Sequence, residues 1–214
     1  MNKFFKILFI FLGLYFISCD NLEVKNTSFS RIEIIGPDEI NIHNQIQIYK
    51  DSIDYKLDNV IGYSEELYTK SDFNNINFNS SLGNLVSDII FIQSDSVFKR
   101  QQNKQIDFVL QNHGGIRSSL LKGDIKLTDI YKILPFENEI VIIEVLGEVV
   151  EEMISFLKKE TNPHPISGLS IRNNEILIQN KIIDSSKKYY LATNDYLLNG
   201  GDNMFFLGKN TKVY

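Results

Sequence analysis

The stretch QNHGGIRSSLLKGD, residues 111 to 124, follows the apolar run IDFVL and joins polar side chains to a pair of glycines. Gly114 and Gly115 permit positive φ angles and let a ligand approach the main chain without a Cβ in its way. Asn112 offers amide donors and an acceptor, and Arg117 offers a planar fork that suits hydroxyl, carboxylate or phosphate groups. Composition alone supports two interpretations equally: a tight turn with a solvated arginine, or the floor of a ligand pocket.

A second stretch of this kind is NDYLLNGGDNMFF, residues 194 to 206, which again sets a glycine pair beside polar and aromatic residues. Tyr196 lies six residues before Asp202, so a short helical turn would present an aromatic ring and a carboxylate to the same pocket. The alternative places Tyr196 in the core and makes residues 199–202 a hairpin turn. Under both interpretations Phe205 and Phe206 are expected in the core.

Apolar periodicity predicts the elements around these stretches. Helices are expected over residues 43–57, 81–100 and 148–160, with a shorter helix opening at Thr128 and ending before Pro135, and a helical turn over residues 194–198. Strands are expected over residues 29–35, 106–111, 139–146, 169–172, 175–179 and 187–193. Because these elements mix without a repeating βαβ unit, the pattern favours a single α+β domain with a mixed β-sheet and packed helices.

Two of the predicted helices carry apolar faces that are expected to pack on the core. The face of the helix over residues 43–57 consists of Ile46, Tyr49, Ile53 and Leu57. The broader face of the helix over residues 81–100 consists of Leu82, Leu85, Val86, Ile89, Ile90 and Val97.

The first nineteen residues, MNKFFKILFIFLGLYFISC, are typical of an export signal, with Lys3 and Lys6 flanking the start of an apolar core. Cys19 is the only cysteine of the chain and resembles a bacterial lipoprotein site, although Phe16 stands where leucine is usual. Lipidation of Cys19 is therefore predicted, and a free thiol in a retained signal anchor is the alternative. Residues 20–28 are polar and predict a tether.

Charge and length restrict the class of protein further. The 214 residues carry 22 Lys and Arg against 27 Asp and Glu, a formal net charge of −5. The sequence contains no run rich in Lys or Arg of the kind that follows a phosphate backbone, which argues against a nucleic-acid polymer as partner. Residues 29–214, which follow the signal and the tether, have the length of one globular domain.

Read in order, NHGGIRSSLLKGDI, LTDIYKILPFENEIV and YYLATNDYLLNGGDNMFF resemble the C-terminal domain of the 5′-nucleotidase family, and LGNLVSD at residues 82–88 resembles its upstream helix start. The family pattern is N-x-G-G-I-R, then G-[DT]-I, a P-F-x-N loop and [YF]-L-x-x-G-G-D, at similar spacing. The resemblance extends from about residue 46 to residue 206. It implies a nucleoside-binding domain in which aromatic rings sandwich the base.

The resemblance implies substrate-binding roles for particular residues of this chain. Asn112 and Arg117 match the Asn and Arg of the family's glycine-rich turn. Tyr196 matches one stacking aromatic, and Asp202 matches the sugar-binding carboxylate. The glycines that shape the pocket correspond to Gly114, Gly115, Gly200 and Gly201. The P-F-x-N loop, which is expected to be mainly structural but offers Asn138 as a further candidate contact, corresponds to Pro135, Phe136 and Asn138.

The chain departs from the family pattern at three places. Ile76 and Asn79 stand where the family commonly has Arg and Glu, so one phosphate or sugar contact has no counterpart there. Where many members place a second stacking aromatic, this chain reads NPHPISG, and His164 either stacks instead or is an ordinary surface-loop histidine, the second being favoured. Members usually continue past the G-G-D segment, so a C-terminus truncated at Tyr214 is expected.

The family hydrolyses phosphomonoesters with two metal ions that a separate N-terminal domain holds. The histidines of this chain are His43, His113 and His164, and none lies in a D-x-H or G-H-x-H pattern. No metal or other cofactor is therefore expected in this chain, and divalent metal ions are expected in a partner. His113 is expected to line the pocket as a turn residue rather than to bind metal.

These inferences predict the nucleoside- or nucleotide-recognition half of a split 5′-nucleotidase, working in nucleotide catabolism with a separate metallophosphoesterase polypeptide. No residue of this chain is assigned a catalytic role. The protein is expected to be exported and held in the cell envelope by its lipid anchor. The alternatives are a non-catalytic envelope lipoprotein that binds nucleosides and a structural envelope protein that has lost the pocket.

Overall fold

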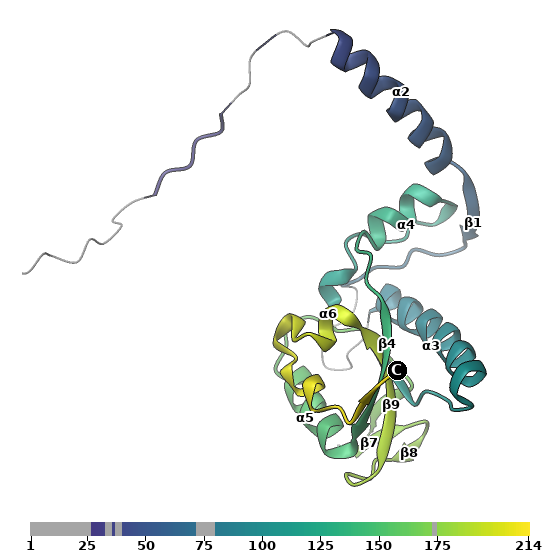
Figure 1. The fold of residues 1–214 in the computed structure, drawn as a ribbon, viewed down its shortest axis with the longest axis vertical. Coiled ribbons are helices and arrows are strands. Elements are labelled where there is room, and N and C mark those ends of the chain that lie inside the picture. The colour runs from purple at the N-terminus through teal and green to yellow at the C-terminus, as the bar shows by residue number, and fades with distance from the viewer. Residues whose placement is uncertain (1–26, 33–35, 37–39, 72–79, 173–174) are drawn as a thin grey trace, which may run out of the picture. The chain divides into compact units, whose positions relative to one another are not determined.

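The computed structural model describes residues 27–32, 36, 40–71, 80–172 and 175–214 (Figure 1). The chain divides into two compact units, Met1–Asn44 and Gln45–Tyr214, and the candidate site lies wholly in the second. The predicted signal with Cys19 and all but the last two residues of the predicted tether lie outside the described residues. Among the described residues, no helix is long and apolar enough to cross a membrane.

A five-stranded sheet forms the centre of the second unit (Figure 1). Its strand order is β10, β4, β9, β2, β5, with bounds Lys212–Val213, Ile140–Leu146, Lys188–Asn194, Phe108–Leu110 and Ile166–Ser167. Strands β2 and β9 are parallel, and the other neighbours are antiparallel. The predicted α+β fold with a mixed sheet is therefore confirmed.

The sheet is buried on both faces because successive side chains of its strands point to opposite sides. Phe108 and Leu110 of β2 contribute to one core cluster, while Val109 between them contributes to a second. Strand β9 divides in the same way, with Leu191 in the first cluster and Ala192 in the second. This arrangement explains why the central strands read as nearly continuous apolar runs.

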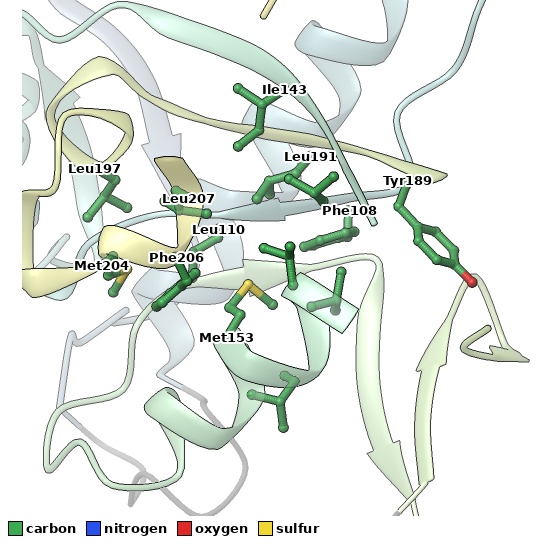
Figure 2. Packing of buried hydrophobic residues seen from close by; sticks show 14 of the residues in the cluster. Phe108, Leu110, Ile143, Met153, Tyr189, Leu191, Leu197, Met204, Phe206 and Leu207 are labelled. Atoms are coloured by element: carbon green, nitrogen blue, oxygen red, sulfur yellow. The ribbon is translucent and has the colours of Figure 1, made fainter. Parts of the chain in front are cut away.

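The larger core cluster lies between the sheet and the helix α5, which spans Gly147–Leu157. Met153 of α5 packs among side chains of the strands and of the C-terminal segment (Figure 2). That segment contributes Leu197, Met204, Phe206 and Leu207. The core therefore fixes the backbone on both sides of the G-G-D motif, at residues 197 and 204.

The second cluster forms where α3, Ser81–Gln102, packs against β2, β5 and β9. Ser80 is the N-cap of α3, and its Oγ accepts a hydrogen bond from the Gly83 N–H at 3.1 Å. Phe98 is the large buried side chain near the other end of the helix. The helix itself is confirmed, and so is most of its predicted apolar face, since Leu82 is buried and Leu85, Val86 and Ile90 pack against core clusters.

Smaller elements complete the unit. They are the antiparallel pair β1 (Val60–Ser64) and β3 (Gly123–Lys126), the helix α4 (Leu127–Ile133), the sheet of β6 (Leu169–Arg172), β7 (Glu175–Ile178) and β8 (Lys181–Ile182), the helix α6 (Asp195–Leu198), and the 3₁₀ helices η2 (His113–Gly115), η3 (Gly201–Asn203) and η4 (Phe205–Lys209). The helix α2, Ile40–Leu57, precedes them.

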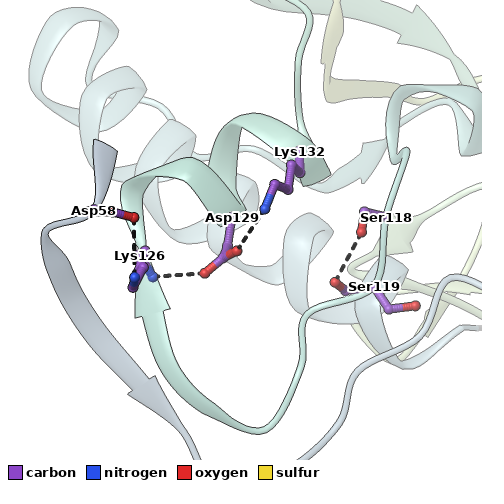
Figure 3. A network of polar contacts seen from close by, with 6 residues as sticks. All are labelled: Asp58, Ser118, Ser119, Lys126, Asp129 and Lys132. Atoms are coloured by element: carbon purple, nitrogen blue, oxygen red, sulfur yellow. Dashed lines mark hydrogen bonds and ion pairs between the residues drawn. The ribbon is translucent and has the colours of Figure 1, made fainter. Parts of the chain in front are cut away.

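A polar network ties the turn between α2 and β1 to the start of α4 (Figure 3). The Lys126 ammonium contacts the Asp58 carboxylate at 3.1 Å, and the Lys126 N–H donates to Asp129 Oδ2 at 2.9 Å. The helix α4 therefore begins at Leu127 with Lys126 as its N-cap residue. The predicted opening of this helix with Thr128 as its N-cap is wrong, because the N-cap is Lys126, two residues earlier, whose N–H donates to the Asp129 carboxylate.

Three further predictions of local structure are wrong in whole or in part. In the described part of the predicted strand over residues 29–35, Phe29–Ile32 belongs to no strand and is exposed. The helix α2 exists, but Ile46, Tyr49 and Ile53 on its predicted core face are exposed. On α3, Ile89 and Val97 are exposed, and Ser87 and Ser94 are buried instead. Periodicity located both helices and much of the covered face of α3, but the face that it predicted for α2 is exposed.

Candidate functional site

Strand directions bring four distant segments to one edge of the central sheet. Because β2 and β9 are parallel, the chain leaves both strands at the same edge. Strand β4 starts there, since Ile140 pairs with Asn194, and β5 starts there, since Ile166 pairs with Leu110. We call this the site edge. It gathers the turn after β2, the loop before β4, the loop before β5, and α6 with η3.

The turn after β2 is held in place by its own backbone and by its neighbours. The Arg117 N–H donates to Ile133 O at 2.8 Å, and the Ile116 side chain is buried in a small apolar cluster. The Arg117 guanidinium donates to Gly114 O at 3.3 Å. The two interpretations of QNHGGIR are thus not exclusive: the stretch is a fixed turn, and it keeps Arg117 exposed at the site edge.

Asn194 links this turn to α6, a role that sequence reasoning missed. Its Nδ2 donates to Asn112 Oδ1 at 3.0 Å and to Gln111 Oε1 at 3.1 Å. Its Oδ1 accepts from the Leu197 N–H at 2.8 Å and thereby caps α6. Since the oxygen of the Asn112 amide is engaged by Asn194, its NH₂ group is the part left to donate to a ligand. The T-N-D sequence before a short helix was the available signal, because Asn is a favoured N-cap.

Tyr196 and Asp202 lie side by side, as the spacing in residues 194–206 predicts. The Tyr196 hydroxyl donates to Asp202 Oδ1 at 2.8 Å, and this hydrogen bond raises the pKa of the phenol. The Tyr196 ring is 43 % exposed, which excludes the alternative core placement. Residues 201–203 form the 3₁₀ helix η3 rather than a hairpin turn. Gly201 lies directly against the ring, and a Cβ there would overlap it.

The P-F-x-N loop presents a second aromatic ring. Phe136 is 55 % exposed, and the Arg117 guanidinium lies 6.0 Å from its ring centroid. Asn138 in the same loop is exposed too. The loop is tied to α6, because the Glu139 N–H donates to Asp195 Oδ1 at 3.1 Å and the Asp195 N–H donates to Glu139 O at 3.0 Å. Phe136 is therefore not part of the core, while the mainly structural role of this loop stays a prediction.

A buried pair of histidines lies beneath the turn. The His113 N–H donates to His164 Nδ1 at 3.3 Å, and the His113 ring contacts Pro163 O through Nδ1 at 3.1 Å. His164 is only 5 % exposed, so its favoured assignment as a surface-loop histidine is wrong. Burial lowers the pKa of both imidazoles, and the Lys70 charge lowers that of His113 further. Both rings are consequently neutral near pH 7.

The position of Phe205 differs from the prediction. It was expected in the core, yet it is 70 % exposed and lies beside Gly200, whose φ of +87° favours glycine. A Cβ at Gly200 would approach the Phe205 ring to 2.9 Å. Phe206, by contrast, is buried as predicted. The difference follows from η4, which turns adjacent side chains in different directions.

The described residues contain no cluster of three or more His, Cys, Asp or Glu side chains that could hold a metal ion. What the site edge offers instead are two exposed rings, amide and carboxylate groups, and the Arg117 cation. The predicted residues lie on segments that meet there: Asn112, Gly114, Gly115, Arg117, Asn138, Tyr196, Gly200, Gly201 and Asp202. Their contacts with a ligand stay predictions.

Fold and site together define an α+β domain that displays aromatic rings, amide and carboxylate groups and an arginine along one sheet edge. The sequence model of the protein family "5′-nucleotidase, C-terminal domain" matches residues 60–208 of this chain. Because this match covers more than half of the chain, the protein belongs to that family.

Known relatives agree with this assignment. Protein UshA of Escherichia coli is 30 % identical over 105 residues, which cover 45 % of this chain and 19 % of UshA. The NAD 5′-nucleotidase of Haemophilus influenzae is 27 % identical over 130 residues, which cover 50 % of this chain and 22 % of that protein. The chain thus matches about a fifth of the length of these curated relatives.

A solved structure shows the same fold. The 5′-nucleotidase precursor of Thermus thermophilus superposes with a TM-score of 0.64 at 22 % sequence identity. The match covers 83 % of this chain and 38 % of that chain.

Proposed function

We propose that this protein is the nucleoside- or nucleotide-recognition half of a split 5′-nucleotidase, and that a separate metallophosphoesterase polypeptide supplies the divalent metal ions. The observation that carries the proposal is the convergence of the family's two substrate-side motifs on one sheet edge through the parallel pairing of β2 with β9. Asn112 and Asn194, one at each motif, are 82 residues apart in sequence. In this reading the chain binds and orients the nucleotide, and phosphate release occurs on the partner.

The exposed rings would hold the base. Tyr196 is fixed from one side by Gly201 and through its hydroxyl by Asp202. Phe136 is a second exposed ring on a loop tied to the same helix. Base stacking on an aromatic is worth about 1–3 kcal/mol, so two rings would provide a large share of the binding free energy.

Polar groups would hold the sugar and the phosphate. The free NH₂ group of the Asn112 amide can donate to a sugar hydroxyl or base edge, and the Asp202 carboxylate can accept from sugar hydroxyls. Arg117 can meet phosphate oxygens with its planar fork. Each hydrogen bond adds roughly 0.5–1.5 kcal/mol net. After the cost of association, affinity near the millimolar range of about −4 kcal/mol is expected for this half alone.

The experiment that tests the proposal combines binding with hydrolysis. Adenosine at millimolar concentration should shift the NMR signals of Gly114, Gly115 and Gly201 selectively, with Gly62 on β1 as the internal control. Purified chain with Mg²⁺ or Mn²⁺ should release no phosphate from AMP, and a metallophosphoesterase encoded beside it should gain activity when the chain is added. Turnover of AMP by the chain alone would refute the split arrangement.

The alternative function is capture of nucleosides by an envelope lipoprotein without any hydrolysis. The same mixture separates it from the split enzyme, because it predicts the glycine shifts but no gain of activity with a partner. For both functions we propose export and lipid anchoring through Cys19, since the segment before it is typical of a lipoprotein signal. Metabolic labelling with a fatty-acid analogue should mark the wild-type protein and not Cys19→Ser.

A further inference from the structure

Lys70 lies beside Arg117 at the turn after β2. Its ammonium donates to Ile116 O at 2.6 Å, while the Arg117 guanidinium donates to Gly114 O at 3.3 Å. Two cations are thus held by carbonyl oxygens of one short turn. Lys70 comes from the segment after β1, 46 residues away in sequence.

The backbone around Lys70 is fixed in this position. Tyr68 and Leu120 exchange two backbone hydrogen bonds, at 2.9 and 3.0 Å. The Thr69 N–H donates to Ser81 Oγ at 2.8 Å, and Thr69 O accepts from the Leu82 N–H at 2.9 Å. The residues before Lys70 are therefore pinned both to the turn and to the start of α3, so the placement of its ammonium is preorganised.

The two positive charges have no carboxylate partner within the part of the chain that the structure describes. The ion pairs there involve Lys126, Lys132, Lys188 and Lys209. Burial and, next, the charge of Arg117 lower the pKa of Lys70. Like charges at close range oppose each other unless an anion lies between them. An anion bound between the two cations would remove this repulsion.

We propose that Lys70 and Arg117 together form the subsite for the phosphate of a nucleotide, and that Lys70 makes this chain prefer a nucleoside monophosphate to the nucleoside. The inference rests on the proposed function. Arg117 provides a planar fork and Lys70 a point charge. Ribose hydroxyls are neutral and gain little from a second cation, whereas phosphate, with a charge of about −2, is stabilised by each one.

The test compares AMP with adenosine in NMR titrations of the full chain. The proteins are wild type, Lys70→Met and Lys70→Arg. Lys122→Met is the matched control, because Lys122 is an exposed lysine between the turn after β2 and strand β3. Wild type should bind AMP more tightly than adenosine. Lys70→Met should weaken AMP binding about tenfold and leave adenosine binding unchanged. Lys70→Arg should retain the preference, and Lys122→Met should match wild type.

Other outcomes reject the inference in recognisable ways. If Lys70→Met weakens AMP and adenosine equally, Lys70 is structural and the phosphate assignment is wrong. If it changes neither, Lys70 contacts no ligand. Inorganic phosphate should shift the Arg117 signals in wild type and less so in Lys70→Met, which separates anion binding from base stacking. Wild type that binds neither AMP nor adenosine would refute the proposed function itself, and the subsite with it.

Discussion

Asn194→Ala is the substitution that best tests how the site edge is assembled. The wild-type side chain makes three hydrogen bonds at once: it caps α6 through Oδ1, and it joins Gln111 and Asn112 to that helix through Nδ2. Alanine removes all three without adding bulk. Asn194→Ser is the matched control, because its hydroxyl can still accept the capping hydrogen bond from the Leu197 N–H.

The expected loss in the free energy of unfolding follows from these contacts. Loss of the N-cap costs about 1 kcal/mol. The amide oxygens of Gln111 and Asn112, both in buried residues, each lose a donor at about 1 kcal/mol. Asn194→Ala should therefore lower the free energy of unfolding by about 3 kcal/mol, and Asn194→Ser by about 2 kcal/mol. For a unit of this size, 3 kcal/mol corresponds to a fall in Tm of about 9 °C.

Urea unfolding of the two variants, of Asn112→Ala and of the double variant with Asn194→Ala measures the link directly. A coupling free energy of about 1 kcal/mol between positions 112 and 194 is expected. Adenosine binding should weaken in Asn194→Ser although the cap is kept, because the amide of Asn112 is no longer oriented. Additive effects, or a loss of under about 1 kcal/mol in Asn194→Ala, would refute the view that Asn194 joins the turn to α6.

Two further predictions concern the aromatic ring and the histidines. Gly201→Ala should displace the Tyr196 ring and weaken adenosine binding, whereas Gly208→Ala, whose Cβ would meet nothing within 4 Å, should bind as wild type; equal affinities in NMR titrations would contradict this. Burial lowers the folded-state pKa of His113 and His164, so the unfolded chain takes up protons first, below about pH 6.5. The free energy of unfolding should therefore fall between pH 7 and pH 5, and His164→Gln should reduce that slope in urea titrations; an unchanged slope would argue against the buried pair.

Local structure could largely be predicted because it depends on local sequence. The strands β4 and β6 and the start of α5 at Gly147 agree closely with the periodicity. Tyr196 and Asp202 could be paired because only one helical turn separates them. The contact thus depended on helix geometry alone.

What could not be predicted depends on contacts between distant segments. Nothing local to His164 indicates that the backbone of His113 will cover it, since their hydrogen bond spans 51 residues. Nothing in the sequence around Lys70 distinguishes it from the other lysines, because its place at the turn depends on the pairing of β1 with β3. Ile89 lies on the predicted apolar face of α3 and is exposed, whereas Ser87 of the same helix is buried. Periodicity identifies an apolar face but not how much of it a neighbour buries.

The glycines of the two motifs look equivalent in the sequence, but the structure does not require all of them, nor for the same physical reason. Gly115 is a matter of space, because a Cβ there would lie 2.9 Å from the oxygen of Asn112, which Asn194 holds in place. Gly200 is a matter of backbone conformation as well, since its φ is +87°. Gly114 differs from both: a Cβ would meet only the Asn112 amide nitrogen, at 3.7 Å, an ordinary van der Waals contact. The first glycine pair therefore shapes the site through one residue, and that residue acts by leaving room for the Asn112 amide.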